Sequence, residues 1–151
     1  MYHAIVRRRV AQTFHALSRG DYEFALAGMA PRFEHIFAGN HALGGTRHTV
    51  AGMRLWFERM FRLNQKLDFT IQHIAVSGTP WDTTAIIEWR DTATLANGDT
   101  SYVNDGTHII RMRWGQVISL HAYLDTQKVV TVFRQMAKEG IAEAVAAAIE
   151  D

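Results

Sequence analysis

The chain has 151 residues and a formal net charge of +1, from 16 basic and 15 acidic side chains. A charge this close to zero gives no reason to expect nucleic acid or an anionic membrane as a partner. The sequence has no cysteine, which excludes disulfides and thiolate chemistry and leads us to expect the cytoplasm. No apolar run approaches the ~18 residues of a membrane span, and the N-terminus has no signal-peptide core. The length predicts one domain over residues 1–151.

The first half of the chain predicts helices around one short strand. Val6, Val10, Phe14 and Leu17 recur at helical spacing and form one apolar stripe. Capping residues and helix-breaking glycine or proline mark where the helices begin and end. The expected elements are helices over 3–18, 22–29 (capped by Asp21, stopped by Pro31) and 50–62 (capped by Thr49), a strand over 32–38, and a glycine-rich loop over 39–46.

From Leu67 onward the apolar pattern changes to a period of two. Leu67, Phe69 and Ile71 alternate with polar residues, which indicates a strand with one buried face. Similar runs follow, separated by glycine-containing turns, and predict four consecutive antiparallel strands. The turns lie at 78–81, Asn97-Gly98 and Trp114-Gly115. After the strands come a helix that starts at Asp125 or Thr126 and ends near residue 138, and a short C-terminal helical extension over 139–151.

The strand before Trp114-Gly115 is the longest β-rich segment. It could reach about 14 residues, against a usual strand length of about 5–6. A strand this long has to bend, and Gly106 in its middle is the expected bulge or kink. A bent sheet has a concave face, on which a pocket can form. Helices followed by a meander predict an α+β fold: a cone-shaped barrel in which a curved antiparallel sheet wraps around the N-terminal helices and leaves an open pocket.

This order of elements resembles the nuclear transport factor two-like superfamily, within which the SnoaL-like polyketide cyclases and ketosteroid isomerases look nearest. The resemblance covers residues 3–137 and rests on the element pattern with Gly20-Asp21, the glycine-rich loop, and the strand sequences 115–118 and 123–125. It implies the cone fold and a single SnoaL-like domain. The superfamily includes isomerases, dehydratases, epoxide hydrolases, cyclases and non-catalytic binders, so the fold alone does not choose an activity.

The ketosteroid isomerase catalytic set matches this chain only in part. Its base carboxylate stands at the end of the first strand, where His35 takes the place if a small gap is allowed. Its oxyanion-binding carboxyl on the long strand matches His108, and Thr13 replaces the oxyanion tyrosine of the first helix. The resemblance therefore points to histidine chemistry in the pocket, which dehydratases of this superfamily also use.

The epoxide hydrolase set is also incomplete. Those enzymes carry an Arg-x-Asp pair on the strand before the Asn97-Gly98 turn; Asp91 matches the aspartate, but Trp89 replaces the arginine. Ala122 stands in the place of their second aspartate. Neither activity can be transferred to this chain.

Strand parity predicts which side chains face the pocket. Alternate residues of a strand share one face, so His108 and Asp91 pointing inward fix the direction of their neighbours. We expect His35 and His108 to act as general base and proton donor, with Asp91 orienting one of them. A buried histidine bonded to a backbone carbonyl is the alternative, as is a plain core role for the aromatic residues. The expected ligand-binding residues are Thr13, Trp56, Phe69, Trp89, Asn104, Ile110, Leu120 and Ala122.

Two functions follow from this pocket. The first is an enzyme that performs proton-transfer chemistry (isomerase, dehydratase or cyclase) on a small, mainly apolar carbonyl compound without a cofactor. The alternative is a non-catalytic binder of a hydrophobic ligand. No metal is expected, because His35, His41 and His48 are spaced by six and seven residues without a carboxylate pattern. A homodimer through the outer sheet face is also expected, from outward Val103, Ile109, His121 and Tyr123.

Overall fold

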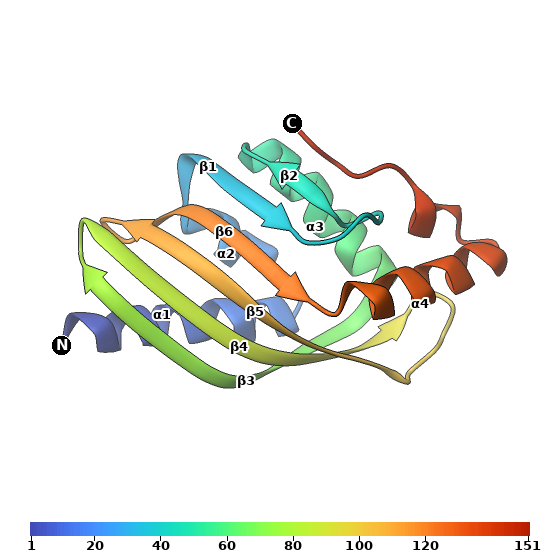
Figure 1. Cartoon of the computed structure of the whole chain (residues 1–151), viewed down its shortest axis with the longest axis horizontal. Coiled ribbons are helices and arrows are strands. Elements are labelled where there is room, and N and C mark those ends of the chain that lie inside the picture. Colours follow the sequence, from blue (N-terminus) through green and yellow to red (C-terminus); the bar gives the residue numbers. More distant parts are fainter.

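The computed structural model describes all 151 residues. The helices are α1 (Tyr2–Ser18), α2 (Tyr22–Ala27), α3 (Val50–Leu63), α4 (Thr126–Lys138) and the short 3-10 helix η1 (Ala142–Val145). The strands are β1 (Met29–Phe37), β2 (Gly45–Arg47), β3 (Asn64–Thr79), β4 (Asp82–Leu95), β5 (Tyr102–Arg113) and β6 (Gln116–Leu124). They form one curved sheet in the order β2-β1-β6-β5-β4-β3, with α1, α2 and α3 on one side and α4 beyond the end of β6 (Figure 1). This is the expected α+β cone.

The expected apolar stripe of α1 is confirmed. Val6, Val10, Phe14 and Leu17 are all buried, and the helix packs against β3 and β4. The predicted caps are also confirmed, because each side chain accepts a hydrogen bond from the third backbone N–H of its helix. These caps are Asp21 for α2, Thr49 for α3 and Asp125, not Thr126, for α4.

The first strand is longer than expected, and the sheet has an extra edge strand. β1 begins at Met29 rather than at residue 32, so Pro31 lies inside it. Proline is tolerated there because the pairing of β1 with β6 is interrupted between Met29 and Glu34. The expected loop over 39–46 runs into β2, which pairs antiparallel with β1. Since β1 and β6 run parallel, the sheet is mixed rather than wholly antiparallel.

The meander of β3 to β6 is confirmed, but the role expected for Gly106 is wrong. The ladder between β4 and β5 is continuous through the pair Trp89 and Gly106. The interruptions of the meander lie elsewhere, in the β3–β4 ladder at Gln65/Asp68 and Ile71/His73 and in the β5–β6 ladder at Arg111/Met112. A Cβ atom at Gly106 would meet the Trp89 ring at 2.4 Å and the Tyr123 carbonyl oxygen at 2.7 Å. Gly106 therefore makes room for the Trp89 indole; it is not a bulge.

The helix expected within the C-terminal extension over 139–151 is reduced to the four residues of η1. The following residues lie extended against β2 and the start of α3. There, Glu150 Oε1 accepts the Thr46 N–H at 3.0 Å, and the Asp151 carboxylate bonds Thr49. These contacts need an extended tail, and a helix too short to be stable alone does not compete with them.

Candidate functional site

An internal cavity of about 110 Å³ lies between the concave face of the sheet and the helices. On one side is the apolar core of α2, α3 and α4, and on the other the core of α1 with β4 and β5. Of its 30 lining residues, 22 are hydrophobic, which suits a small, mainly apolar ligand. His35, Asp91 and His108 all line this cavity. So do most residues expected to bind the ligand, namely Thr13, Trp56, Phe69, Trp89, Ile110 and Leu120.

Asn104 and Ala122 are fully buried but are not part of the cavity lining. The Asn104 side chain is used within the protein. Its Oδ1 accepts the backbone N–H groups of Asp105 and Asp125, and its Nδ2 donates to the Asp125 carbonyl and the Tyr102 hydroxyl. Asn104 therefore ties β5 to the start of α4 and fixes the Tyr102 side chain. Asn104 does not line the cavity itself but supports Tyr102, which does.

His108 is held by the indole of Trp89. Trp89 Nε1 donates to His108 Nδ1 at 2.7 Å, and the Phe14 ring packs edge-on against the imidazole with the centroids 5.1 Å apart. An indole N–H only donates, so Nδ1 is the acceptor and the neutral ring carries its proton on Nε2. The ring's one hydrogen bond uses Nδ1, and His108 lines the cavity, so Nε2–H is left to donate to a ligand. Burial, with a contribution from His121, lowers the pKa of His108 to about 3.

His35 is held in the same tautomer by a different donor. Arg47 Nε donates to His35 Nδ1 at 2.9 Å, and the Trp56 ring packs edge-on at 4.7 Å between centroids. A guanidinium N–H cannot accept, so the remaining proton of the neutral imidazole is on Nε2. Burial and then the charge of Arg47 hold the pKa of His35 well below its usual value. Both histidines are therefore neutral hydrogen-bond donors toward the cavity.

Arg47 is a residue that sequence reasoning missed. Its guanidinium is fully buried and donates to the backbone carbonyls of Gly44, Gly45 and Ile149 as well as to His35. The sequence did not indicate β2, because a strand of three residues is too short to show an alternating apolar pattern. Once β2 pairs with β1, Arg47 lies directly opposite His35.

Asp91 is the acidic group of the cavity. Its side chain is buried on β4 beside Phe69 of β3, and its Oδ1 has no hydrogen-bond partner. Burial raises the pKa of Asp91 to about 7, although the backbone N–H groups of Asn104 and Asp91 favour the ionised form. A carboxyl that titrates near neutral pH can both take and return a proton.

Tyr102 adds a neutral donor next to Asp91, and sequence reasoning missed it as well. Its hydroxyl oxygen accepts the Asn104 amide N–H at 3.1 Å, so the hydroxyl proton is left for another acceptor. Burial and the nearby Asp91 carboxylate raise the pKa of Tyr102, so the phenol stays protonated. Tyr102 precedes Asn104 by two residues on β5 and so shares its face of the sheet, but no motif in the sequence marked it.

The structure does not bring the predicted catalytic residues into mutual contact. No hydrogen bond joins His35, His108 or Asp91. His35 and His108 flank β6 from its two sides, opposite Leu120 and Ala122. Asp91 pairs with Asn104 of β5, which lies four residues before His108. At about 3.3 Å per residue, Asp91 and His108 are therefore about 13 Å apart along the strand direction. The cavity therefore has a histidine end and an Asp91–Tyr102 end, joined by apolar walls.

The histidines considered as metal ligands do not meet. His41 bonds the Ala38 carbonyl at 2.9 Å, and His48 Nδ1 bonds the Asp151 carbonyl at 3.0 Å. The structure gathers no group of three histidine or carboxylate side chains. A separate observation is that none of its helices has the length and apolar character needed to cross a membrane.

Similar folds occur among solved structures. PrhC from Penicillium brasilianum NBRC 6234 superimposes with a TM-score of 0.77 at 14% identity, covering 91% of each chain. A protein assigned as a SnoaL-like polyketide cyclase from Jannaschia sp. CCS1 gives 0.67 at 17% identity, covering 82% of this chain and 88% of that one. A protein with a ketosteroid isomerase-like fold from Catenulispora acidiphila DSM 44928, in complex with trimethylamine, gives 0.65 at 16% identity, covering 76% and 83%. No curated protein sequence matches this chain.

The curved sheet, the helices on its concave side and the internal apolar cavity define the nuclear transport factor two-like cone fold. The model of the SnoaL-like domain matches residues 10–120. The chain therefore belongs to the SnoaL-like domain family, as its resemblance predicted. Some members of this family are polyketide cyclases or other small-molecule enzymes. The structural likeness establishes the fold, and the chemistry has to be argued from the cavity.

Proposed function

We propose that this protein is an enzyme that transfers protons on a small, mainly apolar carbonyl compound, as an isomerase, dehydratase or cyclase. One observation carries the proposal: a buried carboxyl without a partner on Oδ1, that of Asp91, lines an apolar cavity that also holds neutral hydrogen-bond donors. Leaving such a carboxyl unpaired is costly to the fold. Groups of this kind with a strongly shifted pKa are typical of active sites.

Asp91 is the general base in this proposal. Its carboxylate takes a proton from the carbon next to the substrate carbonyl, and the C–H electron pair moves into an enolate. The Tyr102 hydroxyl donates to the enolate oxygen as charge develops there. Asp91 then returns the proton to a second carbon, or the enolate attacks an electrophilic carbon in a cyclisation. The pKa of Asp91, raised to about 7, suits both steps at neutral pH.

The histidines serve as donors rather than bases. Each Nδ1 already accepts a hydrogen bond from a group that cannot itself accept, so neither His35 nor His108 has a free basic nitrogen. Their Nε2–H groups suit a second carbonyl or hydroxyl oxygen at the other end of the ligand. This assignment differs from the roles we expected from the sequence. It implies an elongated substrate with an oxygen near each end and no net charge, because neither neutral donors nor apolar walls favour an ion.

Proton exchange in D₂O tests the proposal without knowledge of the product. A panel of cyclic enones and aryl ketones is incubated with the protein, and loss of the proton signal next to the carbonyl is followed by NMR. We expect exchange that accelerates as pH rises through about 7, because Asp91 must be ionised to act. Asp91→Asn should abolish it, and Tyr102→Phe should slow it about 10²–10³-fold, as loss of an oxyanion donor does.

Asp105→Asn is the matched control. Asp105 lies one residue beyond Asn104 and its carboxylate pairs with Arg90 on the exposed face. Its loss should leave exchange unchanged at high pH, where Asp91 is ionised with or without the weak repulsion from Asp105. An Asp91→Asn variant that exchanges a panel member as fast as the wild type would sink the proposed base.

The alternative is a non-catalytic binder of the same class of ligand. It is favoured by Thr13 and Trp89, which stand where related enzymes carry a tyrosine and an arginine. The Thr13 hydroxyl is also occupied, since it donates to the Arg9 carbonyl at 3.0 Å. Native mass spectrometry of the purified protein distinguishes the two: a bound compound that is released unchanged after long incubation supports the binder.

A further inference from the structure

The buried guanidinium of Arg47 has no carboxylate bonded to it. Its hydrogen bonds go to His35 Nδ1 at 2.9 Å and to the carbonyls of Gly44 (2.7 Å), Gly45 (2.7 Å) and Ile149 (2.8 Å). Burying a charge without a counter-ion costs free energy, and burial lowers the pKa of Arg47 to about 10, which still leaves it charged at neutral pH. A residue this costly that bonds a cavity-lining histidine directly is a candidate for function.

The C-terminal segment Ile149–Asp151 completes the surroundings of Arg47. Ile149 supplies one of its carbonyl acceptors. The next two residues attach the segment on either side, since Glu150 accepts the Thr46 N–H at 3.0 Å and Asp151 accepts the Thr49 N–H at 3.3 Å and its hydroxyl. The charges of Glu150 and Asp151 also favour the charged form of Arg47 from a distance. The segment thus bridges β2 and the start of α3 over the guanidinium.

We propose that Arg47 is the positioning residue of His35, and that the segment Ile149–Asp151 holds Arg47 in place. Arg47 fixes the imidazole as the Nε2–H tautomer, because its Nε–H occupies Nδ1. The Trp56 ring supports both groups, edge-on to His35 and 5.4 Å from the Arg47 Cζ. The C-terminal segment therefore determines, through one arginine, which proton the cavity presents to a ligand. Only the claim that this proton meets substrate rests on the proposed function.

Histidine NMR tests the positioning role without any substrate. Long-range ¹H–¹⁵N spectra of ¹⁵N-labelled protein report whether each ring nitrogen carries a proton. We expect a single Nε2–H form for His35 in the wild type, and loss of that single form in Arg47→Met. Arg47→Lys retains the charge but not the planar fork, so it should restore the single form only in part. Arg90→Met is the control, because Arg90 pairs with Asp105 on the exposed face.

A second variant keeps the inference testable if Arg47→Met does not fold. In Glu150→Ala/Asp151→Ala the guanidinium stays and only the attachment of the segment is removed. We expect His35 in this variant to exchange between tautomers, and the D₂O exchange rate to fall about 10–100-fold, as when a supporting shell is lost. An unchanged His35 spectrum in Arg47→Met overturns the positioning role of Arg47, and an unchanged spectrum in the segment variant overturns the role of the segment.

Experiment can refute the enzymatic function and the positioning role of Arg47 independently of each other. If the spectra change as expected while the wild type exchanges no proton on any substrate, Arg47 still positions His35 and the enzymatic function is wrong. If Asp91→Asn abolishes exchange while Arg47 and segment variants keep the wild-type spectrum, the function stands and the positioning role is wrong.

Discussion

Asp91 makes the folded state less stable as its carboxyl ionises. Its folded pKa of about 7 lies above the ordinary value of 3.8, so the folded protein binds this proton more tightly than the unfolded chain does. The resulting stabilisation is complete below pH 3.8 and is lost as pH rises through 7. The catalytic use that we propose for Asp91 therefore comes with a cost in stability.

Asp91→Asn should accordingly stabilise the protein at high pH. At pH 8 we expect the free energy of unfolding to rise by up to about 4 kcal/mol, from a shift of about 3 pKa units. At pH 4 the difference from wild type should fall below about 1 kcal/mol, because Asp91 is then neutral in the folded state and only partly ionised in the unfolded chain. Urea unfolding of both proteins across this pH range measures it. A gain that is equal at pH 4 and pH 8 would contradict the assignment.

The sequence predicted which residues line the cavity better than it predicted the hydrogen bonds between them. Alternation along β4 and β5, with the family resemblance, predicted inward His108, Asp91 and Trp89 correctly. It could not predict that Trp89 would donate to His108 Nδ1, because that bond depends on rotamers and on the register between two strands. The tautomers, and with them the chemistry we propose, follow from such bonds rather than from the residue types.

At the scale of elements, the Trp89–Gly106 pair connects the sheet to the site. The Trp89 ring lies over the position that a Gly106 side chain would fill, and the same indole holds His108. Glycine weakens a strand in general, yet here an aromatic ring from the neighbouring strand covers it. The long strand β5 therefore continues through Gly106 without a bulge.

Gly106→Ala should destabilise the protein by about 1–3 kcal/mol, the usual range for overpacking a core. The added Cβ would lie 2.4 Å from the Trp89 ring and 2.7 Å from a backbone oxygen, and only the ring can move. Thermal unfolding measures the loss. Gly28→Ala is the control, because its Cβ would meet only the Ala25 carbonyl oxygen at an ordinary 3.5 Å. Equal melting temperatures for the two variants would refute this account of Gly106.

The elements that were not predicted from the sequence were missed for one physical reason. Helices and strands with a long apolar period, such as α1 and β3 to β6, were predictable because local pattern and tertiary packing agree. β2 and the C-terminal segment were not, since both are short and are joined to each other by single polar contacts between residues far apart in the sequence, among them Arg47 to Ile149 and Thr46 to Glu150. Contacts of this kind leave no periodic trace in the sequence.

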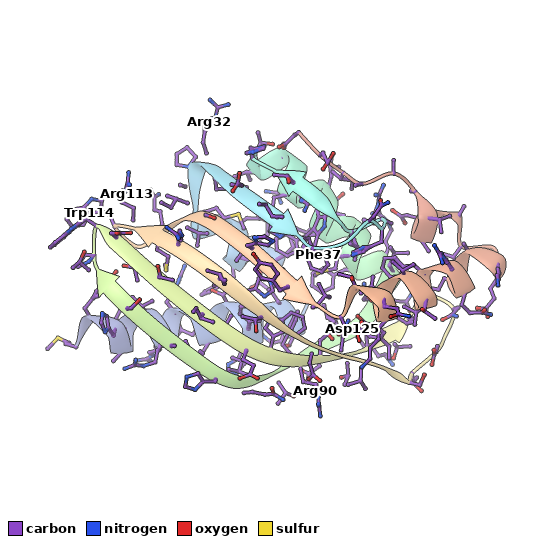
Figure 2. The ribbon with its side chains drawn as sticks, viewed as in Figure 1. Arg32, Phe37, Arg90, Arg113, Trp114 and Asp125 are labelled. Carbon is purple, nitrogen blue, oxygen red and sulfur yellow. The ribbon has the colours of Figure 1, made fainter.

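For the molecule as a whole, the convex face of the sheet remains without a covering layer. It carries exposed Ile86, Val103 and Tyr123 from three adjacent strands, at 40%, 38% and 46% of their surface. His121 stacks on Tyr123 with the ring centroids 3.9 Å apart, and Arg90 points outward from the same sheet (Figure 2). Helices cover only the concave side (Figure 1), so the convex apolar residues are free to meet a second copy.

We therefore predict that the wild type sediments at twice its 17.1 kDa chain mass at micromolar concentration. Ile86→Asp/Tyr123→Asp should sediment as a monomer, because a two-fold interface would bury four unpaired carboxylates in this double variant. Trp114→Ser is the control: Trp114 is 69% exposed but lies at the β5–β6 turn, at the opposite end of the strand from Asp125 (Figure 2). Its variant should stay dimeric, since the turn is away from the face. A wild type that sediments at 17.1 kDa would exclude the dimer.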